Sequence, residues 1–236
     1  MNLDRYAPRL LGAAFLIVIL TSMIGGTSLT SAVGSKDVSD ILANIPARLS
    51  QVQFSILAQL LTSSLIVVLA VLLYTVLKTQ SRILALVALG WWLAEAISLA
   101  VSQMGVIALI PLSGDFVAAG APHQSFYQAL GEFLYYGLYT RAYTMHMWFY
   151  CIGGLVWYSL FFASRYIPRA ISLFGVLAVA LGFIGIVAEF SGYDVPMSVY
   201  MPIGLFELII GLWLLLKGIR SGVETGKRAA TVRLST

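Results

Sequence analysis

The sequence is poor in charge and in cysteine. Of its 236 residues, only 10% are charged, whereas soluble domains usually carry about a quarter. Its single cysteine, Cys151, excludes a disulfide within the chain and a metal cage built from several cysteines. Apolar residues dominate instead: 60% are hydrophobic and the mean hydropathy is +0.92. This composition predicts an integral membrane protein.

Motifs for nucleotide-driven and common hydrolytic chemistry are also missing. The sequence has no Walker loop, no Gly-x-Ser-x-Gly elbow, no His-Glu-x-x-His and no dinucleotide fingerprint. Its two histidines, His123 and His146, lack the paired spacing of metal ligands. We therefore predict no metal site, and the sequence identifies no cofactor.

Six apolar runs have the length that a helix needs to cross about 30 Å of hydrocarbon. Strands of a membrane barrel would alternate in polarity at every second residue, and these runs do not. The predicted fold is all-α, a six-helix transmembrane bundle forming one domain over 1–220, followed by a basic tail over 221–236. We expect the spans at residues 10–29, 52–77, 83–110, 143–164, 170–190 and 200–218.

Lysine and arginine are distributed unevenly between the connections. One set comprises Arg5, Arg9, Lys78, Arg82, Arg165, Arg169 and the tail, whereas the alternate loops hold only Lys36, Arg48 and Arg141. By the positive-inside rule, both termini are expected in the cytoplasm, with the chain in a bacterial inner (plasma) membrane. Because the basic residues flank the membrane and form no single groove, we expect no nucleic-acid partner.

The connection between the third and fourth spans holds an amphipathic stretch over 126–139. Apolar residues recur there at helical spacing, with polar ones on the other side. An unbroken helix over 126–164 would be about 58 Å long, which is too long for one crossing. We therefore predict a separate interfacial helix over 126–139 with a bend around 137–141.

Four ionisable residues lie inside the apolar runs: Glu95, His146, Glu189 and Glu207. A carboxylate near the bilayer centre costs roughly 2.5–3.5 kcal/mol, so such groups face the protein interior or a cavity. Counting helical rise places Glu95 at mid-membrane and the other three in the outer half. This distribution predicts a polar pocket biased to the outside, with Glu95, His146 and Glu207 as the candidate catalytic residues.

Neighbours on the same helix faces, and polar residues at similar depth, are candidate ligand-binding residues. Trp92 and Ser98 lie within one turn of Glu95, and Tyr150 lies one turn after His146. The full set is Gln59, Trp92, Ser98, Gln103, Tyr150 and Glu189. Each could also be a packing residue, which is the commoner role of such side chains in membrane helices.

Short motifs near the second half of the chain resemble one known family. They are Tyr166-Ile167-Pro168-Arg169 opening a helix, the helix with His146 before it, Phe206-Glu207-Leu208, and 212–218. Together they resemble bacterial DUF4386 membrane proteins, over Arg9 to Gly218, and Glu95 follows Trp91-Trp92 where that family tends to carry an acid. The resemblance implies six helices and shared importance of Glu95, His146 and Glu207, but no reaction.

These observations leave several function classes open. The first is a membrane protein whose pocket binds a hydrophobic or amphipathic small molecule, such as a membrane lipid, an isoprenoid or a quinone-like compound. The second is an intramembrane enzyme that uses the Glu and His side chains as acid and base on such a molecule. The third is a non-catalytic scaffold, as a homo-oligomer or as a subunit of a larger membrane complex. Proton-coupled transport is disfavoured because the inner halves of the spans carry no polar relay.

Overall fold

A computed structural model describes residues 3–122 and 124–219, and within these ranges the chain is helical without strands. Six of its helical segments are long and apolar enough to cross a membrane, which confirms the predicted all-α, six-helix membrane fold. The predicted tail over 221–236 and His123 lie outside the described residues. The elements are α1 (Leu3–Val33), α2 (Val38–Ala47), α3 (Leu49–Leu77), α4 (Arg82–Ala118), α5 (Phe126–Glu132), the π-helical segment η1 (Phe133–Thr140), α6 (Arg141–Ser164), α7 (Arg169–Phe190), the 3-10 turn η2 (Met197–Val199) and α8 (Met201–Lys217).

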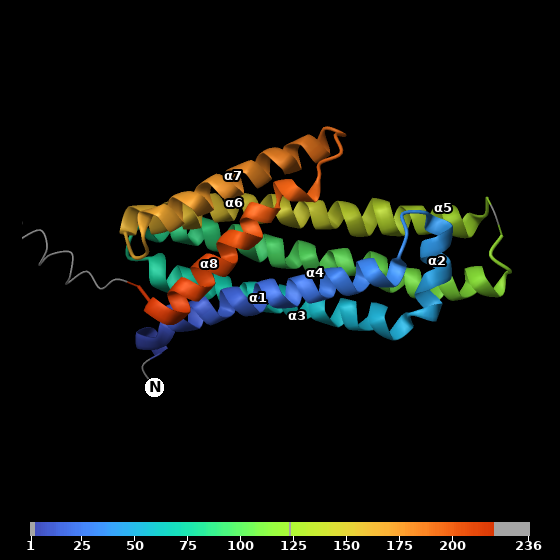
Figure 1. The fold of residues 1–236 in the computed structure, drawn as a ribbon, viewed down its shortest axis with the longest axis horizontal. Helices are drawn as coiled ribbons and strands as arrows, with labels where there is room; N and C mark the ends of the chain where they lie inside the picture. Colours follow the sequence, from blue (N-terminus) through green and yellow to red (C-terminus); the bar gives the residue numbers. More distant parts are fainter. Residues whose placement is uncertain (1–2, 123, 220–236) are drawn as a thin grey trace, which may run out of the picture.

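The six long helices form a closed ring. Each packs against two neighbours, in the order α1, α3, α4, α6, α7, α8 and back to α1, and α3 also touches α6 across the ring. Figure 1 shows α1, α3, α4 and α6 running side by side along the longest axis, with α7 and α8 lying against one half of them. The ring is therefore complete only along that half of the molecule.

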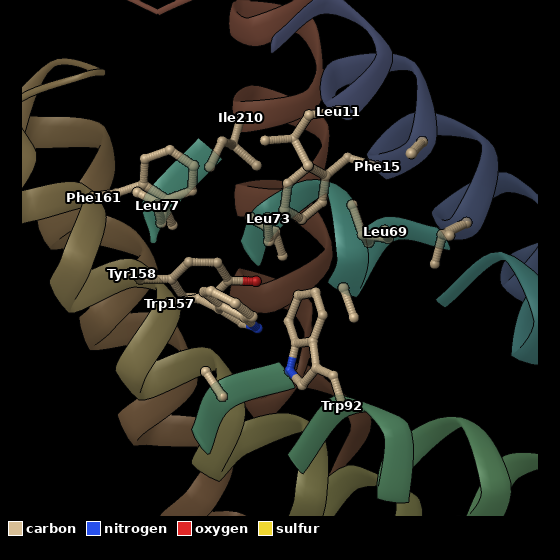
Figure 2. Packing of buried hydrophobic residues seen from close by; sticks show 14 of the residues in the cluster. Leu11, Phe15, Leu69, Leu73, Leu77, Trp92, Trp157, Tyr158, Phe161 and Ile210 are labelled. Carbon is tan, nitrogen blue, oxygen red and sulfur yellow. The ribbon is translucent and has the colours of Figure 1, made fainter. Parts of the chain in front are cut away.

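Aromatic side chains fill the interior of the ring. Trp92 of α4 and Trp157 of α6 are fully buried and meet edge to face, with ring centroids 6.2 Å apart. Figure 2 shows them beside Tyr158, surrounded by leucines of α3 and by Leu11, Phe15 and Ile210 from α1 and α8. Dense packing of this kind leaves little room for a molecule at the centre of the ring.

Glycines let two pairs of elements approach to backbone contact. A Cβ atom at Gly12 of α1 would lie 2.3 Å from the backbone nitrogen of Leu215 in α8. A Cβ atom at Gly105 of α4 would lie 2.6 Å from the carbonyl oxygen of Leu134 in η1. Without a hydrophobic force between helices in lipid, such small-residue contacts are a main source of association.

The connections at the two ends of the bundle differ in charge. Figure 1 shows the N-terminus, the turn between α6 and α7 and the end of α8 at one end of the molecule. This end, called the basic end, carries Arg9, Lys78, Arg82, Arg165, Arg169 and Lys217. The opposite end is called the outer end, after the predicted orientation. The orientation, the span limits and the division into domain and tail stay predictions.

Four of the ring helices extend past α7 and α8 at the outer end. The helix α4 has 37 residues and is about 55 Å long, whereas α8 has 17 residues. A second hydrophobic cluster occupies this overhang, which we call the outer region (residues 29–56 and 106–139). On α1 the exposed large apolar side chains end at Ile24, before this region begins. The overhang therefore has a core of its own.

The separate interfacial helix predicted over 126–139 is not confirmed. The elements α5, η1 and α6 follow one another without interruption, and Figure 1 shows them as one long helix. Thr140 and Arg141 keep right-handed helical angles where a bend was expected. Leu130 and Leu134 pack in the outer-region cluster, so part of the apolar face covers protein, whereas Phe126 and Phe133 stay exposed at 75% and 62%. A continuous helix over 126–164 is also not too long for the membrane, because its first part lies in the overhang and need not fit within the hydrocarbon.

Candidate functional site

Glu95 of α4 and His146 of α6 face each other in the ring interior. Both are buried, at 3% and 7% exposure, and His146 Nε2 lies 3.9 Å from Glu95 Oε1. His146 Nδ1 lies 3.0 Å from the carbonyl oxygen of Tyr143. A carbonyl only accepts, so Nδ1 carries a hydrogen and Nε2 is the atom that can exchange a proton with Glu95. The second carboxyl oxygen of Glu95 has no hydrogen-bond partner in the described part of the chain.

Glu207 of α8 is held by two tyrosines of α6. Tyr150 Oη donates to Glu207 Oε1 at 3.0 Å, and the hydroxyls of Tyr150 and Tyr158 are 3.1 Å apart. Because the single hydroxyl hydrogen of Tyr150 goes to Glu207, Tyr158 donates to Tyr150. We call Glu95, His146, Tyr150, Tyr158 and Glu207 the deep cluster; it joins α4, α6 and α8.

Trp92 positions the deep cluster from one turn before Glu95. Its indole stacks on the ring of Tyr150 with centroids 5.6 Å apart, and its Nε1 donates to the Tyr150 carbonyl oxygen at 3.2 Å. Gly153 permits this approach, since a Cβ atom there would lie 2.4 Å from Trp92 Cδ1. Trp92 and Tyr150 are thus engaged with each other in the packed interior.

A pocket of about 280 Å³ lies at the outer end of α7 and α8, against the side of the long η1–α6 helix. Glu189, near the end of α7, is half-buried in it. Tyr200 Oη donates to Glu189 Oε1 at 2.7 Å. Thr144 Oγ1 lies 3.3 Å from Oε2 and shares its one hydrogen between that oxygen and the Thr140 carbonyl oxygen at 3.2 Å. This outer pocket is lined by Tyr139, Thr140, Tyr143, Thr144, Met147, Ile186, Glu189, Val195, Met197 and Tyr200.

Tyr143 connects the outer pocket with the deep cluster. It lines the pocket, and its ring contacts the imidazole of His146 with centroids 4.8 Å apart. Glu95, His146 and Glu207 themselves do not line this pocket. Of the three candidate catalytic residues, His146 is therefore next to a side chain that lines the pocket, and Glu95 lies beyond His146.

The remaining predicted ligand-binding residues lie apart from the outer pocket. Gln59 of α3 is buried against α1, where a Cβ atom at Gly25 would come 3.0 Å from its Cγ atom. Gln103 is buried on α4 and donates from Nε2 to Ser102 Oγ at 2.9 Å. Ser98 is half-buried on α4. Of the predicted set, only Glu189 lines the outer pocket.

Sequence reasoning missed the tyrosines and methionines of the outer pocket. Tyr139, Tyr143 and Met147 recur every fourth residue along the η1–α6 helix, so they are neighbours along one side of it. That spacing could have indicated a shared surface from the sequence alone. Tyr200 comes from a different element, and nothing local in the sequence pairs it with Glu189.

An organic molecule has room only where a cavity exists. In residues 3–122 and 124–219, no group of three or more His, Cys, Asp or Glu side chains is arranged to hold a metal ion. Cys151 is fully buried within α6, next to the α7 packing face. The outer pocket, with its one carboxylate and three tyrosines, has groups suited to a bound organic ligand. Two further hollows, of about 390 and 520 Å³, lie around Glu132 and Tyr136 in the outer region.

The fold and these sites define a multi-pass helical membrane protein with acids held between its helices. The chain belongs to the DUF4386 family, a domain of unknown function whose family model matches residues 10–218. No curated protein and no solved structure matches the chain. Family membership therefore confirms the resemblance seen in the sequence and adds no reaction.

Proposed function

We propose that the protein binds a hydrophobic or amphipathic small molecule, such as a lipid, an isoprenoid or a quinone-like compound, in the outer pocket. The observation that carries this is the pocket itself, about 280 Å³ with a largely apolar and aromatic lining. Ligand pockets typically measure about 300–1,000 Å³. The outer pocket is at the low end of this range and suits a head group or the first part of a longer molecule.

The place of the pocket supports an amphipathic ligand. It lies where the exposed apolar side chains of α7 end, at Phe190, and those of α8 begin, at Met201. Lipid-facing helices expose apolar side chains within the hydrocarbon region, and this exposure ends at the membrane interface. We place the pocket at the outer interface of a bacterial inner membrane with cytoplasmic termini, because the basic residues gather at the opposite end.

The second candidate function is acid–base chemistry on the bound molecule. It is favoured by one contact: Tyr143 touches both the pocket and His146, which faces Glu95. A shift of the Tyr143 side chain would expose the imidazole to a ligand.

The scaffold alternative rests on the deep cluster, whose hydrogen bonds fasten α6 to α8. In that reading the acids serve packing, in a homo-oligomer or a larger membrane complex.

Filling the pocket tests the binding proposal. Thr140 is exposed and lines the pocket, so Thr140→Trp places an indole there without disturbing the core. Thr27 is an exposed threonine on α1 outside the pocket lining, and Thr27→Trp is the matched control. We expect mass spectrometry of lipid extracts from the purified protein to find a co-purifying molecule that is lost in Thr140→Trp and kept in Thr27→Trp. Equal recovery from both variants would contradict the proposal.

Turnover separates the enzyme from the binding protein. Glu95→Gln and Glu207→Gln keep the size and much of the hydrogen bonding of the side chain but cannot transfer the carboxyl proton. An enzyme would retain the co-purifying molecule in these variants and lose its conversion. A binding protein would show the same molecule, unaltered, in the wild type and in both variants.

A further inference from the structure

Glu189 is a carboxylate without a cationic partner in an otherwise uncharged pocket. Within residues 3–122 and 124–219, no lysine, arginine or histidine nitrogen lies within ion-pair distance of it. Its two hydrogen bonds come from the neutral hydroxyls of Tyr200 and Thr144, one to each oxygen. Each carboxylate oxygen can accept more than one hydrogen bond, so acceptor capacity remains. The pocket therefore contains a negative charge that the described protein does not balance.

Three tyrosines line the same pocket as Glu189. Tyr139 and Tyr143 come from the η1–α6 helix and Tyr200 from the turn before α8. Tyrosine rings present a negative face that attracts a cation within about 6 Å of the ring centre. Because Tyr200 donates its hydroxyl to Glu189, the ring is held beside the carboxylate. Tyrosines around a carboxylate form the kind of cage that binds organic ammonium groups.

An anionic head group fits this pocket poorly. None of the lining residues is Lys, Arg or His, so the pocket has no positive side chain to bind a phosphate or a carboxylate. Glu189 would repel such a group in a half-buried site where solvent screening is weak. Uncharged polar groups would leave the Glu189 charge uncompensated. Charge complementarity thus favours a cation.

The surface beyond the pocket suits an apolar tail. Met197 lines the pocket and is 76% exposed, and Met201 follows at the start of α8 at 66% exposure. These side chains continue into the exposed apolar face of α8. A ligand with its head beside Glu189 could therefore lay its tail along α8 in the lipid.

We infer that the outer pocket recognises an ammonium head group, and that its ligand is an amphipathic amine or quaternary ammonium compound. This inference rests on the proposed binding function and names the class of ligand. Glu189 supplies the compensating charge, Tyr139, Tyr143 and Tyr200 supply the aromatic cage, and the exposed methionines lead the tail into the bilayer.

Matched amphiphiles test the inference. The probes are decyltrimethylammonium, uncharged decanol and decyl sulfate, each titrated below its micelle concentration into protein held in dodecyl maltoside. We expect decyltrimethylammonium to bind most tightly and Glu189→Gln to weaken it about tenfold or more. The control is Glu132→Gln, which removes an exposed acid of the outer region that does not line the pocket. The affinity of Glu132→Gln for decyltrimethylammonium should equal that of the wild type.

The outcomes separate the two proposals. If decanol or decyl sulfate binds as tightly as the cation, Thr140→Trp abolishes binding and Glu189→Gln changes nothing, the ammonium inference is wrong and the binding proposal survives. If no probe binds the wild type and Thr140→Trp does not change the recovery of any co-purifying molecule, both the binding proposal and the ammonium inference are wrong. Thermal unfolding of Glu189→Gln, expected to match the wild type, shows that any loss of affinity is not a loss of fold.

Discussion

The deep cluster and the outer pocket use the same chemistry in opposite surroundings. Each sets a glutamate of one helix against tyrosine hydroxyls, Glu207 with Tyr150 inside the ring and Glu189 with Tyr200 at its outer end. Inside, Glu207 is half-buried like Glu189, but its partner Tyr150 is buried and stacked against an indole. Outside, Glu189 is half-buried beside a cavity of about 280 Å³. The comparison teaches that free space next to the acid, and not the acid itself, distinguishes a binding site from a packing contact.

The helix lengths explain why space exists in only one of the two regions. Within the ring, all six helices are present and their side chains fill the interior. At the outer end α7 and α8 stop, whereas α6 is preceded by η1 and α5 in one long helix. The side of this helix that faces α7 and α8 therefore continues beyond them. The pocket is the corner between that side and the ends of the shorter helices.

The largest effect is expected where the deep cluster is most tightly packed. Gly153→Leu would push Trp92 off Tyr150, because even a Cβ atom there lies 2.4 Å from the indole. Overpacking usually costs about 1–3 kcal/mol, and we expect the upper end or more for a clash with a buried tryptophan. Gly90→Leu is the control, since nothing lies within 4 Å of a Cβ atom at Gly90. Thermal unfolding in detergent measures both; equal midpoints would mean that the deep cluster is loosely packed.

A smaller effect is expected when the Glu95 carboxyl is replaced. Glu95→Leu replaces the carboxyl group 3.9 Å from His146 Nε2 by an apolar side chain, so the buried imidazole loses its polar neighbour, which should cost about 1–3 kcal/mol. Glu95→Gln keeps a polar group beside that nitrogen, and its loss of stability should be a fraction of that of Glu95→Leu. Unfolding curves of the two variants in the same detergent give the difference. A glutamine variant as unstable as the leucine variant would indicate that the pair is held as separated charges.

The smallest effect on stability is expected in the outer pocket. Met197→Ala enlarges the cavity at a side chain that is 76% exposed, so the free energy of unfolding should change by less than about 0.5 kcal/mol. Ile210→Ala removes a fully buried side chain of the ring interior and should cost about 2–5 kcal/mol. The contrast is read from chemical or thermal unfolding of both. If Met197→Ala destabilises as much as Ile210→Ala, the outer pocket belongs to the packed core.

The sequence predicts the fold well because lipid imposes a simple rule. Every backbone polar group must be paired within the membrane, so long apolar runs become helices whatever their partners. The family resemblance rested on Tyr166-Ile167-Pro168-Arg169 and Phe206-Glu207-Leu208, and the match over residues 10–218 confirms it. The separate interfacial helix is not confirmed, because an amphipathic pattern shows that one face is apolar but not what covers it. In this chain α2 and α4 contact α5 and η1 along part of that face.

The sites were harder to predict than the fold. Depth along a helix follows from residue count, and the depths and roles of Glu95, His146 and Glu207 stay predictions, although all three lie in helices long enough to span a membrane. Gln59 has a similar depth on its span and turns toward α1 instead. The outer pocket depends on where α7 and α8 end relative to η1 and α6, which is a relation between distant segments. Glu189 was named as a candidate because of its charge. Its hydrogen-bond partner Tyr200 could not be predicted, because it belongs to a different element.

The π-helical segment Phe133–Thr140 shifts the faces of α5 relative to those of α6. A hydrogen bond from residue i to i+5 encloses one residue more than the α-helical bond, and each residue of an α-helix turns the chain by about 100°. Side chains before and after the segment therefore point in directions that a regular α-helix would not give them. One continuous helix can in this way pack against α2 and α4 in the outer region and also line the outer pocket with Tyr139 and Tyr143.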